Sequence, residues 1–268
     1  MEAAAPPPVA ASAPLSERFA VTRARLATSR GFAVFESSLL LLEGLAVAAA
    51  ANGLSRALPW AAARALFALL VQAGWFWGRV GPLLGGRCSL APRLPSPRAA
   101  TLLAGLAAVA VATREQLSLA NVWRNEQPDW SGALQLVLMG PLHEELLFRG
   151  AFFLPMIGRM SGGGGGGGGS VAVCAALSGL VFALFHAGNL AFPLRYRAAQ
   201  MCFGAVCGAC YAVSLAREGS LFETVLLHAA NNALAALTPV ALVQQHLLAP
   251  RVALPLAAVL LLHLQLLL

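Results

Sequence analysis

Eight apolar runs, each about long enough to cross a lipid bilayer, constrain this chain more than any other feature. A hydrocarbon core of about 30 Å needs about 20 residues of helix. The runs cover roughly residues 32–51, 57–78, 99–121, 132–156, 171–191, 198–216, 221–245 and 252–268. The third run is the weakest, because its apolar part ends at Thr113 and is followed by Arg114 and Glu115. The chain is therefore predicted to be all-α, a polytopic membrane helix bundle with about eight transmembrane helices.

The composition agrees with a membrane protein and excludes an ordinary soluble domain. Of the 268 residues, 59% are hydrophobic and 11% are charged, against about 45–50% and about 25% in soluble domains. The net charge is +7, and all 18 basic residues are arginines. These arginines stand at the ends of apolar runs, where they flank membrane segments. The expected partner is therefore the lipid bilayer and not nucleic acid.

Two cysteines three positions apart in an apolar run, Cys207 and Cys210, have the spacing of a redox or metal dithiol. They lie among small apolar residues and have no second pair to bind a metal with. Cysteine in such surroundings behaves as a small hydrophobic residue. The spacing is therefore interpreted as helix packing.

Two segments differ in composition from the apolar runs. Residues 1–30 are rich in Ala, Pro and Arg and lack the apolar core of a secretory signal. They are predicted to be a disordered tail, either cytosolic or an organellar transit peptide, so the membrane is that of the endoplasmic reticulum or of a plastid-type organelle. Residues 161–170 contain eight consecutive glycines and are predicted to be a flexible loop. Residues 31–268 form the integral membrane domain.

Three groups of polar residues lie inside the predicted spans. Each ionisable side chain costs about 2.5–3.5 kcal/mol at the middle of a membrane, so such residues are usually functional. The groups are His143, Glu144, Glu145 and Arg149 in the fourth run, Phe182 and His186 in the fifth, and His228, Asn231 and Asn232 in the seventh. His246 and His263 are lone imidazoles and are assigned no role.

Helical spacing gives the two adjacent glutamates different surroundings. Glu145 and Arg149 are four residues apart, on one helix face, and are predicted to neutralise each other. Glu144 points elsewhere, because successive residues are 100° apart. Gly140-Pro141 is expected to break or start the helix just before it. At membrane depth such a break is tolerated where it lines a cavity, so water is expected to reach Glu144.

The remaining polar residues fit the chemistry of hydrolysis. His228 and Asn232 share a helix face and supply two donors for a developing negative charge. Together with His186, an unpaired carboxylate is the equipment of a hydrolase that uses a general base. Other protease types match less well: His143-Glu144 begins an H-E-x-x-H zinc motif that Leu147 breaks, Asp129 is the chain's one aspartate, and Ser178 lies in a partial rhomboid-type motif that stays a weaker alternative.

The three polar groups together resemble a known family. Glu144-Glu145-x-x-x-Arg149, Phe182-x-x-x-His186 and His228-x-x-x-Asn232 are similar, in order and spacing, to the motifs of the CPBP family of CAAX prenyl proteases and lysostaphin-resistance-type proteins. The resemblance covers about residues 132–240. It implies an eight-helix intramembrane endopeptidase whose catalytic core is this segment.

The resemblance also implies roles for the motif residues. Glu144 would activate water, and His186 would assist it. His228 and Asn232 would hold the oxyanion. Glu145 and Arg149 fill the remaining motif positions. Members of the family are often labelled metalloproteases, although a glutamate-activated water without zinc is favoured here. If zinc were present, Glu144, His186 and His228 would be its ligands.

The expected substrate is a prenylated CAAX-type protein or another membrane-proximal peptide. The phrase Leu227-His228-Ala-Ala-Asn231-Asn232 looks like bacterial-type members, whereas Leu154-Pro155-Met156 looks like the prenyl-protein branch. The alternative is a non-catalytic membrane scaffold or an immunity-type protein with the same fold. A transporter is less favoured, because no paired repeats are visible.

Overall fold

The computed structural model describes residues 30–58, 61–84, 88–118, 123–124, 127–128, 130–160 and 168–268. The predicted tail, apart from Arg30, lies outside the described residues. Residues 161–167 of the predicted glycine loop lie outside them as well.

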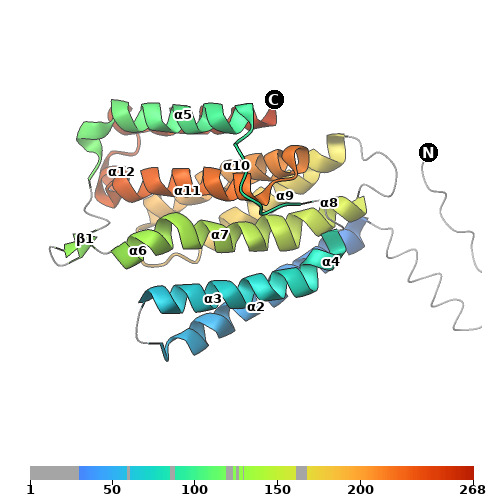
Figure 1. Ribbon diagram of the computed structural model, residues 1–268. Coiled ribbons are helices and arrows are strands. Elements are labelled where there is room, and N and C mark those ends of the chain that lie inside the picture. The colour runs from blue at the N-terminus through green and yellow to red at the C-terminus, as the bar shows by residue number, and fades with distance from the viewer. Residues whose placement is uncertain are drawn as a thin grey trace, which may run out of the picture.

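The described residues form a bundle of helices that run back and forth along one long direction (Figure 1). The α-helices are α2 (Arg30–Ser55), α3 (Ala61–Trp75), α4 (Gly81–Leu84), α5 (Pro97–Ala112), α6 (Trp130–Leu134), α7 (Gly140–Glu145), α8 (Leu154–Met160), α9 (Gly168–His186), α10 (Leu194–Glu218), α11 (Leu221–Leu237), α12 (Val240–His246) and α13 (Pro250–Leu264). Two strands of two residues each, β1 (Trp123–Arg124) and β2 (Gln127–Pro128), pair antiparallel in a connection. The predicted all-α fold class is confirmed.

Every predicted apolar run coincides with helix, but the number of membrane spans is smaller by a length test. Among the described residues, three helices are long and apolar enough to cross a membrane: Ala33–Ser55, Leu194–Glu218 and Pro250–Leu267. A fourth is added if α11 and α12, which are bent by 78° at Thr238-Pro239, count as one span. The third run ends at Ala112, where the weak prediction placed its apolar limit. The count of eight spans is not confirmed.

Gly140-Pro141 starts the α-helical segment α7, one of the two predicted outcomes, but it does not break the helical backbone. The helix continues from Trp130 to Met160 through two π-helical segments, η4 (Gln135–Met139) and η5 (Leu146–Phe153). The Gly140 amide bonds to the Gln135 carbonyl, five residues earlier. We attribute the continuity to this wider turn, which lets the helix accommodate a proline that has no N–H. The π segments stand on both sides of α7, which carries Glu144 and Glu145.

The predicted loop over residues 161–170 is also shorter than expected, because α9 begins at Gly168. Glycine is a poor helix former. The first turn of a helix, however, is held by the residues that follow it, and α9 continues into the apolar sequence Val171–Val173. Propagation from that segment explains how Gly168 and Gly169 become helical.

Helices α9 and α10 approach each other through glycines. A Cβ added at Gly179 would collide with the Ala205 carbonyl oxygen and lie 2.9 Å from the Ala209 nitrogen. A Cβ at Gly208 would lie 3.0 Å from the Gly179 Cα and 3.1 Å from Arg149 Nη2. The two backbones therefore touch, and α10 leaves room for the guanidinium of Arg149.

Candidate active site

The centre of the candidate site is the carboxylate of Glu145, which is fully buried. Its Oε2 lies 3.1 Å from Arg149 Nε, one turn along the same helix. Its Oε1 lies 2.8 Å from His228 Nδ1 on α11. The predicted Glu145–Arg149 pair is confirmed, and His228 is an additional partner of the same carboxylate. A buried carboxylate with two such partners is well compensated for its loss of hydration.

The guanidinium of Arg149 is enclosed by aromatic rings. Its central carbon lies 4.6 Å from the ring centroid of Phe182 and 5.6 Å from that of Tyr211. Among the described residues, its Nη1 and Nη2 have no hydrogen-bond partner, although the side chain is fully buried. The ring faces therefore supply a stabilising cation–π environment where hydrogen-bond acceptors are missing. This explains why a phenylalanine stands one turn before His186.

Glu144 has very different surroundings from its neighbour. Its side chain is 24% exposed, and its Oε2 lies 3.5 Å from His228 Nε2. That distance is at the limit of a hydrogen bond, and Oε2 has no other hydrogen-bond partner in the described part of the chain. Glu144 is thus the more exposed and less closely partnered of the two carboxylates.

His228 stands between the two glutamates, and its protonation can be argued from its contacts. Nδ1 donates its proton to Glu145, since a carboxylate only accepts. Nε2 faces Glu144.

His186 lies at the C-terminal end of α9, half-buried, with its ring edge-on to Phe182 at a centroid distance of 4.6 Å. Its Nδ1 donates to the Phe182 carbonyl oxygen at 2.9 Å. Because that carbonyl cannot donate, the proton sits on Nδ1 and Nε2 of the neutral ring carries a lone pair. His186 therefore presents an acceptor nitrogen.

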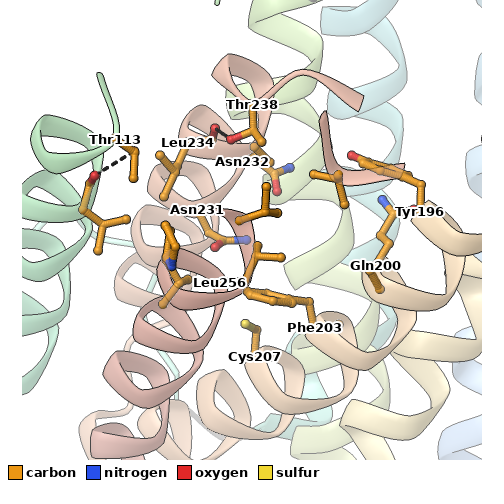
Figure 2. A pocket seen from close by; sticks show the side chains of 18 of the residues that line it. Thr113, Tyr196, Gln200, Phe203, Cys207, Asn231, Asn232, Leu234, Thr238 and Leu256 are labelled. Atoms are coloured by element: carbon orange, nitrogen blue, oxygen red, sulfur yellow. Dashed lines mark hydrogen bonds between the residues drawn. The ribbon is translucent and has the colours of Figure 1, made fainter. Parts of the chain in front are cut away.

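Asn232 lies one turn after His228 on α11. Its amide nitrogen donates to the Leu136 carbonyl oxygen in η4 at 3.0 Å, which leaves its second amide hydrogen unassigned. Both Asn231 and Asn232 line a cavity (Figure 2). The two side chains are therefore positioned at the surface of a space that could admit a substrate.

This cavity has a volume of about 190 Å³ and lies between α5, α10, α11, α12 and α13. Its inner part is formed by Phe203, Cys207, Tyr211 and Val259, and His186 and His228 contribute to its wall. Within the described residues, Glu144, Glu145 and Arg149 are outside this lining. The cavity thus meets the charged cluster at His228, and most of its surface is apolar.

Two residues next to the cluster were missed by the sequence reasoning, Tyr211 and His263. Both are buried, and Tyr211 Oη lies 3.0 Å from His263 Nε2. His263 Nδ1 donates to the Val259 carbonyl oxygen at 2.8 Å, so Nε2 is an acceptor for the tyrosine hydroxyl, whose other acceptor is the Leu227 carbonyl oxygen at 3.4 Å. The Tyr211 ring lies 5.7 Å from the ring of His228. His263 had been assigned no role, since a lone histidine in an apolar run carries no sequence signal.

The alternative chemistries find little support in the geometry. Among the described residues, no group of three or more His, Cys, Asp or Glu side chains is arranged to hold a metal ion, so Glu144, His186 and His228 do not fit zinc as they stand. Ser178, the rhomboid-type candidate, is fully buried and donates to the Phe148 carbonyl oxygen at 3.3 Å. Cys207 and Cys210 are buried and free, as helix packing predicts.

Comparison with protein families gives a match over residues 126–234 to the type II CAAX prenyl endopeptidase Rce1-like family. This segment contains the three motifs and leaves out α2, α3, α5 and α13. Searches of curated proteins and of solved structures find no match. The resemblance drawn from the motifs is confirmed, and it supports an integral membrane protease of the CAAX type at the level of the family.

Proposed function

Because residues 126–234 match the type II CAAX prenyl endopeptidase Rce1-like family, we propose that the protein cuts prenylated CAAX-type or other membrane-proximal peptides with a water activated by Glu144. The observation that carries the mechanism is the unequal bonding of the adjacent glutamates. Glu145 is fully buried between Arg149 at 3.1 Å and His228 at 2.8 Å, whereas Glu144 is 24% exposed and lies 3.5 Å from His228. A general base needs a free lone pair, so Glu144 is the base and Glu145 is not.

The reaction begins when the oxygen of a water molecule attacks the carbonyl carbon of the scissile peptide bond. Glu144 takes a proton from this water, and Nε2 of His186 accepts a hydrogen bond from it. Negative charge then develops on the carbonyl oxygen. Glu144 returns the proton to the leaving nitrogen as the C–N bond breaks. The new carboxylic acid then gives its proton to the released amine, so the products are a carboxylate and an ammonium group.

The developing oxyanion is stabilised by donors from α11. His228 is held at Nδ1 by Glu145, so its Nε2 can donate when the ring is protonated. Asn232 retains an amide hydrogen beyond the one given to the Leu136 carbonyl. Donors that are fixed before the reaction stabilise a transition-state charge with little reorganisation.

The apolar cavity beside His228 and His186 supports a hydrophobic substrate segment. Its walls come mainly from aliphatic and aromatic side chains, and it reaches the candidate donors His228 and Asn232. A peptide with apolar residues near the cleavage site would bury them there.

The decisive experiment compares wild-type protein with Glu144→Gln in detergent or nanodiscs, using a farnesylated CAAX peptide. We expect Glu144→Gln to abolish release of the C-terminal tripeptide while the protein stays folded, because the change removes a base and no buried ion pair. Equal cleavage by the two proteins would exclude Glu144 as the base. Absence of cleavage by wild type would favour the scaffold alternative.

We also propose that the reaction does not need zinc. Purified protein treated with a strong chelator and dialysed is expected to keep its activity. Loss of activity that is restored by stoichiometric zinc would reverse this proposal and make Glu144, His186 and His228 the first ligands to examine.

A further inference from the structure

The cavity beside His228 has a cationic end. Its lining includes Arg251, the second residue of α13, together with Thr113, Gln116 and Thr238 from the ends of α5 and α11. These helix ends gather at the end of the bundle that carries α12 (Figure 1). Among the described residues that line the cavity, Arg251 is the one arginine, and Arg251 lies outside the segment matched by the family.

Arg251 is not engaged in an ion pair within the described residues. The arginines that pair with glutamates in this part of the chain are Arg79, Arg93, Arg149 and Arg159. The side chain of Arg251 is exposed, so its guanidinium stays hydrated and can exchange water for an anion. Guanidinium groups bind carboxylates with two parallel hydrogen bonds, which is the strongest such pairing available to a side chain.

The distance between His228 and this end of the cavity suits a short peptide. His228 lies nine residues before Leu237, the end of α11, so the two are about 13 Å apart along the helix axis. Three extended residues span roughly 10–11 Å. A tripeptide whose scissile bond lies at His228 would therefore bring its C-terminal carboxylate close to the level of the end of α11. The remaining gap is shorter than an arginine side chain.

We propose that Arg251 binds the free C-terminal carboxylate of the substrate, while the two aliphatic residues before it fill the apolar cavity. This inference rests on the proposed function and adds a residue that determines specificity. A prenyl chain in the same cavity would gain nothing from a cation at the end. A free carboxylate explains both the apolar walls and the arginine.

The test measures binding of the tripeptide Val-Ile-Met, as the free acid and as its C-terminal amide, to full-length protein in phosphatidylcholine nanodiscs. Wild type is expected to bind the acid at least tenfold more tightly than the amide. Arg251→Gln is expected to lose this preference, and Arg251→Lys to keep part of it through its charge. The matched control is Arg195→Gln, because Arg195 is the exposed second residue of α10 and does not line the cavity.

Equal affinity of wild type for acid and amide would overturn the proposal, as would an unchanged preference in Arg251→Gln. The same loss in Arg195→Gln would also overturn it, since it would show a general effect of interfacial charge. If Arg251→Gln does not fold, the acid-to-amide ratio of wild type against Arg251→Lys decides. Cleavage of the farnesylated peptide is assayed separately, so an inactive protein that still prefers the acid would reject the proposed function and keep this inference.

Discussion

Two buried carboxylates on facing parts of the bundle, Glu145 and Glu223, are almost equally hidden from solvent, at 0% and 1% exposure. Glu145 is bonded to Arg149 and His228, which are cationic or can become so. Glu223, near the start of α11, accepts only from neutral groups. Its donors are the Ser96 amide at 2.7 Å, the Ser96 hydroxyl at 3.2 Å and the Ser214 hydroxyl at 2.7 Å.

The difference teaches how a functional carboxylate is told from a structural one in this fold. Glu223 joins α5, α10 and α11, its oxygens are satisfied, and it lies outside the cavity lining of the described residues. Glu145 is held by an ion pair with Arg149 and a hydrogen bond with His228, and His228 lines the cavity and faces a second carboxylate, Glu144. Burial alone therefore does not mark the site. The site is marked instead by a second, partly exposed carboxylate, Glu144, next to the buried one.

The largest expected effect comes from removing the charge of these two buried carboxylates. Glu145→Gln should lower the free energy of unfolding by about 3–5 kcal/mol, because it leaves the buried Arg149 without its counter-charge. Glu223→Gln should cost less, about 1–3 kcal/mol, because its partners are neutral donors. Both values can be measured by denaturant titration in micelles, followed by circular dichroism.

The same pair of variants separates stability from activity. After correction for the folded fraction, Glu223→Gln should cleave the farnesylated peptide at the wild-type rate, and Glu145→Gln should not. A loss of turnover in folded Glu223→Gln would show that the two carboxylates are not divided as proposed.

A smaller effect is expected at the donors on α11. His228→Ala and Asn232→Ala should each lower kcat by about 10²–10³, the usual loss for one oxyanion donor. The double variant should lose less than the product, because both groups act on one charge. A change confined to KM would instead assign the two residues to substrate binding.

The smallest effect on kcat is expected for Tyr211 and His263, which contact each other beside His228. Tyr211→Phe or His263→Phe removes one neutral hydrogen bond, worth about 1 kcal/mol, which corresponds to about fivefold in kcat if that bond orients the ring of His228. The double variant should equal the single variants, since the bond is shared. His246→Phe, on α12 and outside the cavity lining, is the control; an equal loss there would remove the argument for positioning.

Much of the fold and part of the site could be predicted from local sequence. Continuous apolar runs are strong signals for helices, and each predicted run contains one or more helices. The Glu145–Arg149 pair followed from helical spacing alone. The three motifs singled out the residues that the structure gathers around His228, because ionisable groups within apolar runs are rare.

The remaining features depend on tertiary contacts or on subtle backbone changes. His263 meets Tyr211 only because α13 packs on α10, and no local pattern encodes that contact. Glu223 did have a signal, the Ser220-x-x-Glu223 capping pattern, in which the Glu223 amide donates to the Ser220 hydroxyl. The continuity of the helix at Pro141 could not be expected, because a π turn has no clear sequence signature.

The glycine contact between α9 and α10 has a consequence for how the substrate reaches the site. Where two backbones touch at Gly179 and Gly208, no side-chain rotation can widen the gap, so α9 and α10 are held together on the side of the cavity that carries His186. The opposite side of the cavity is built from α5, α12 and α13, whose contribution comes from side chains and from the sharp turn after α11. We therefore expect the peptide to enter by a movement of the C-terminal helices α12 and α13, while α9 and α10 stay fixed.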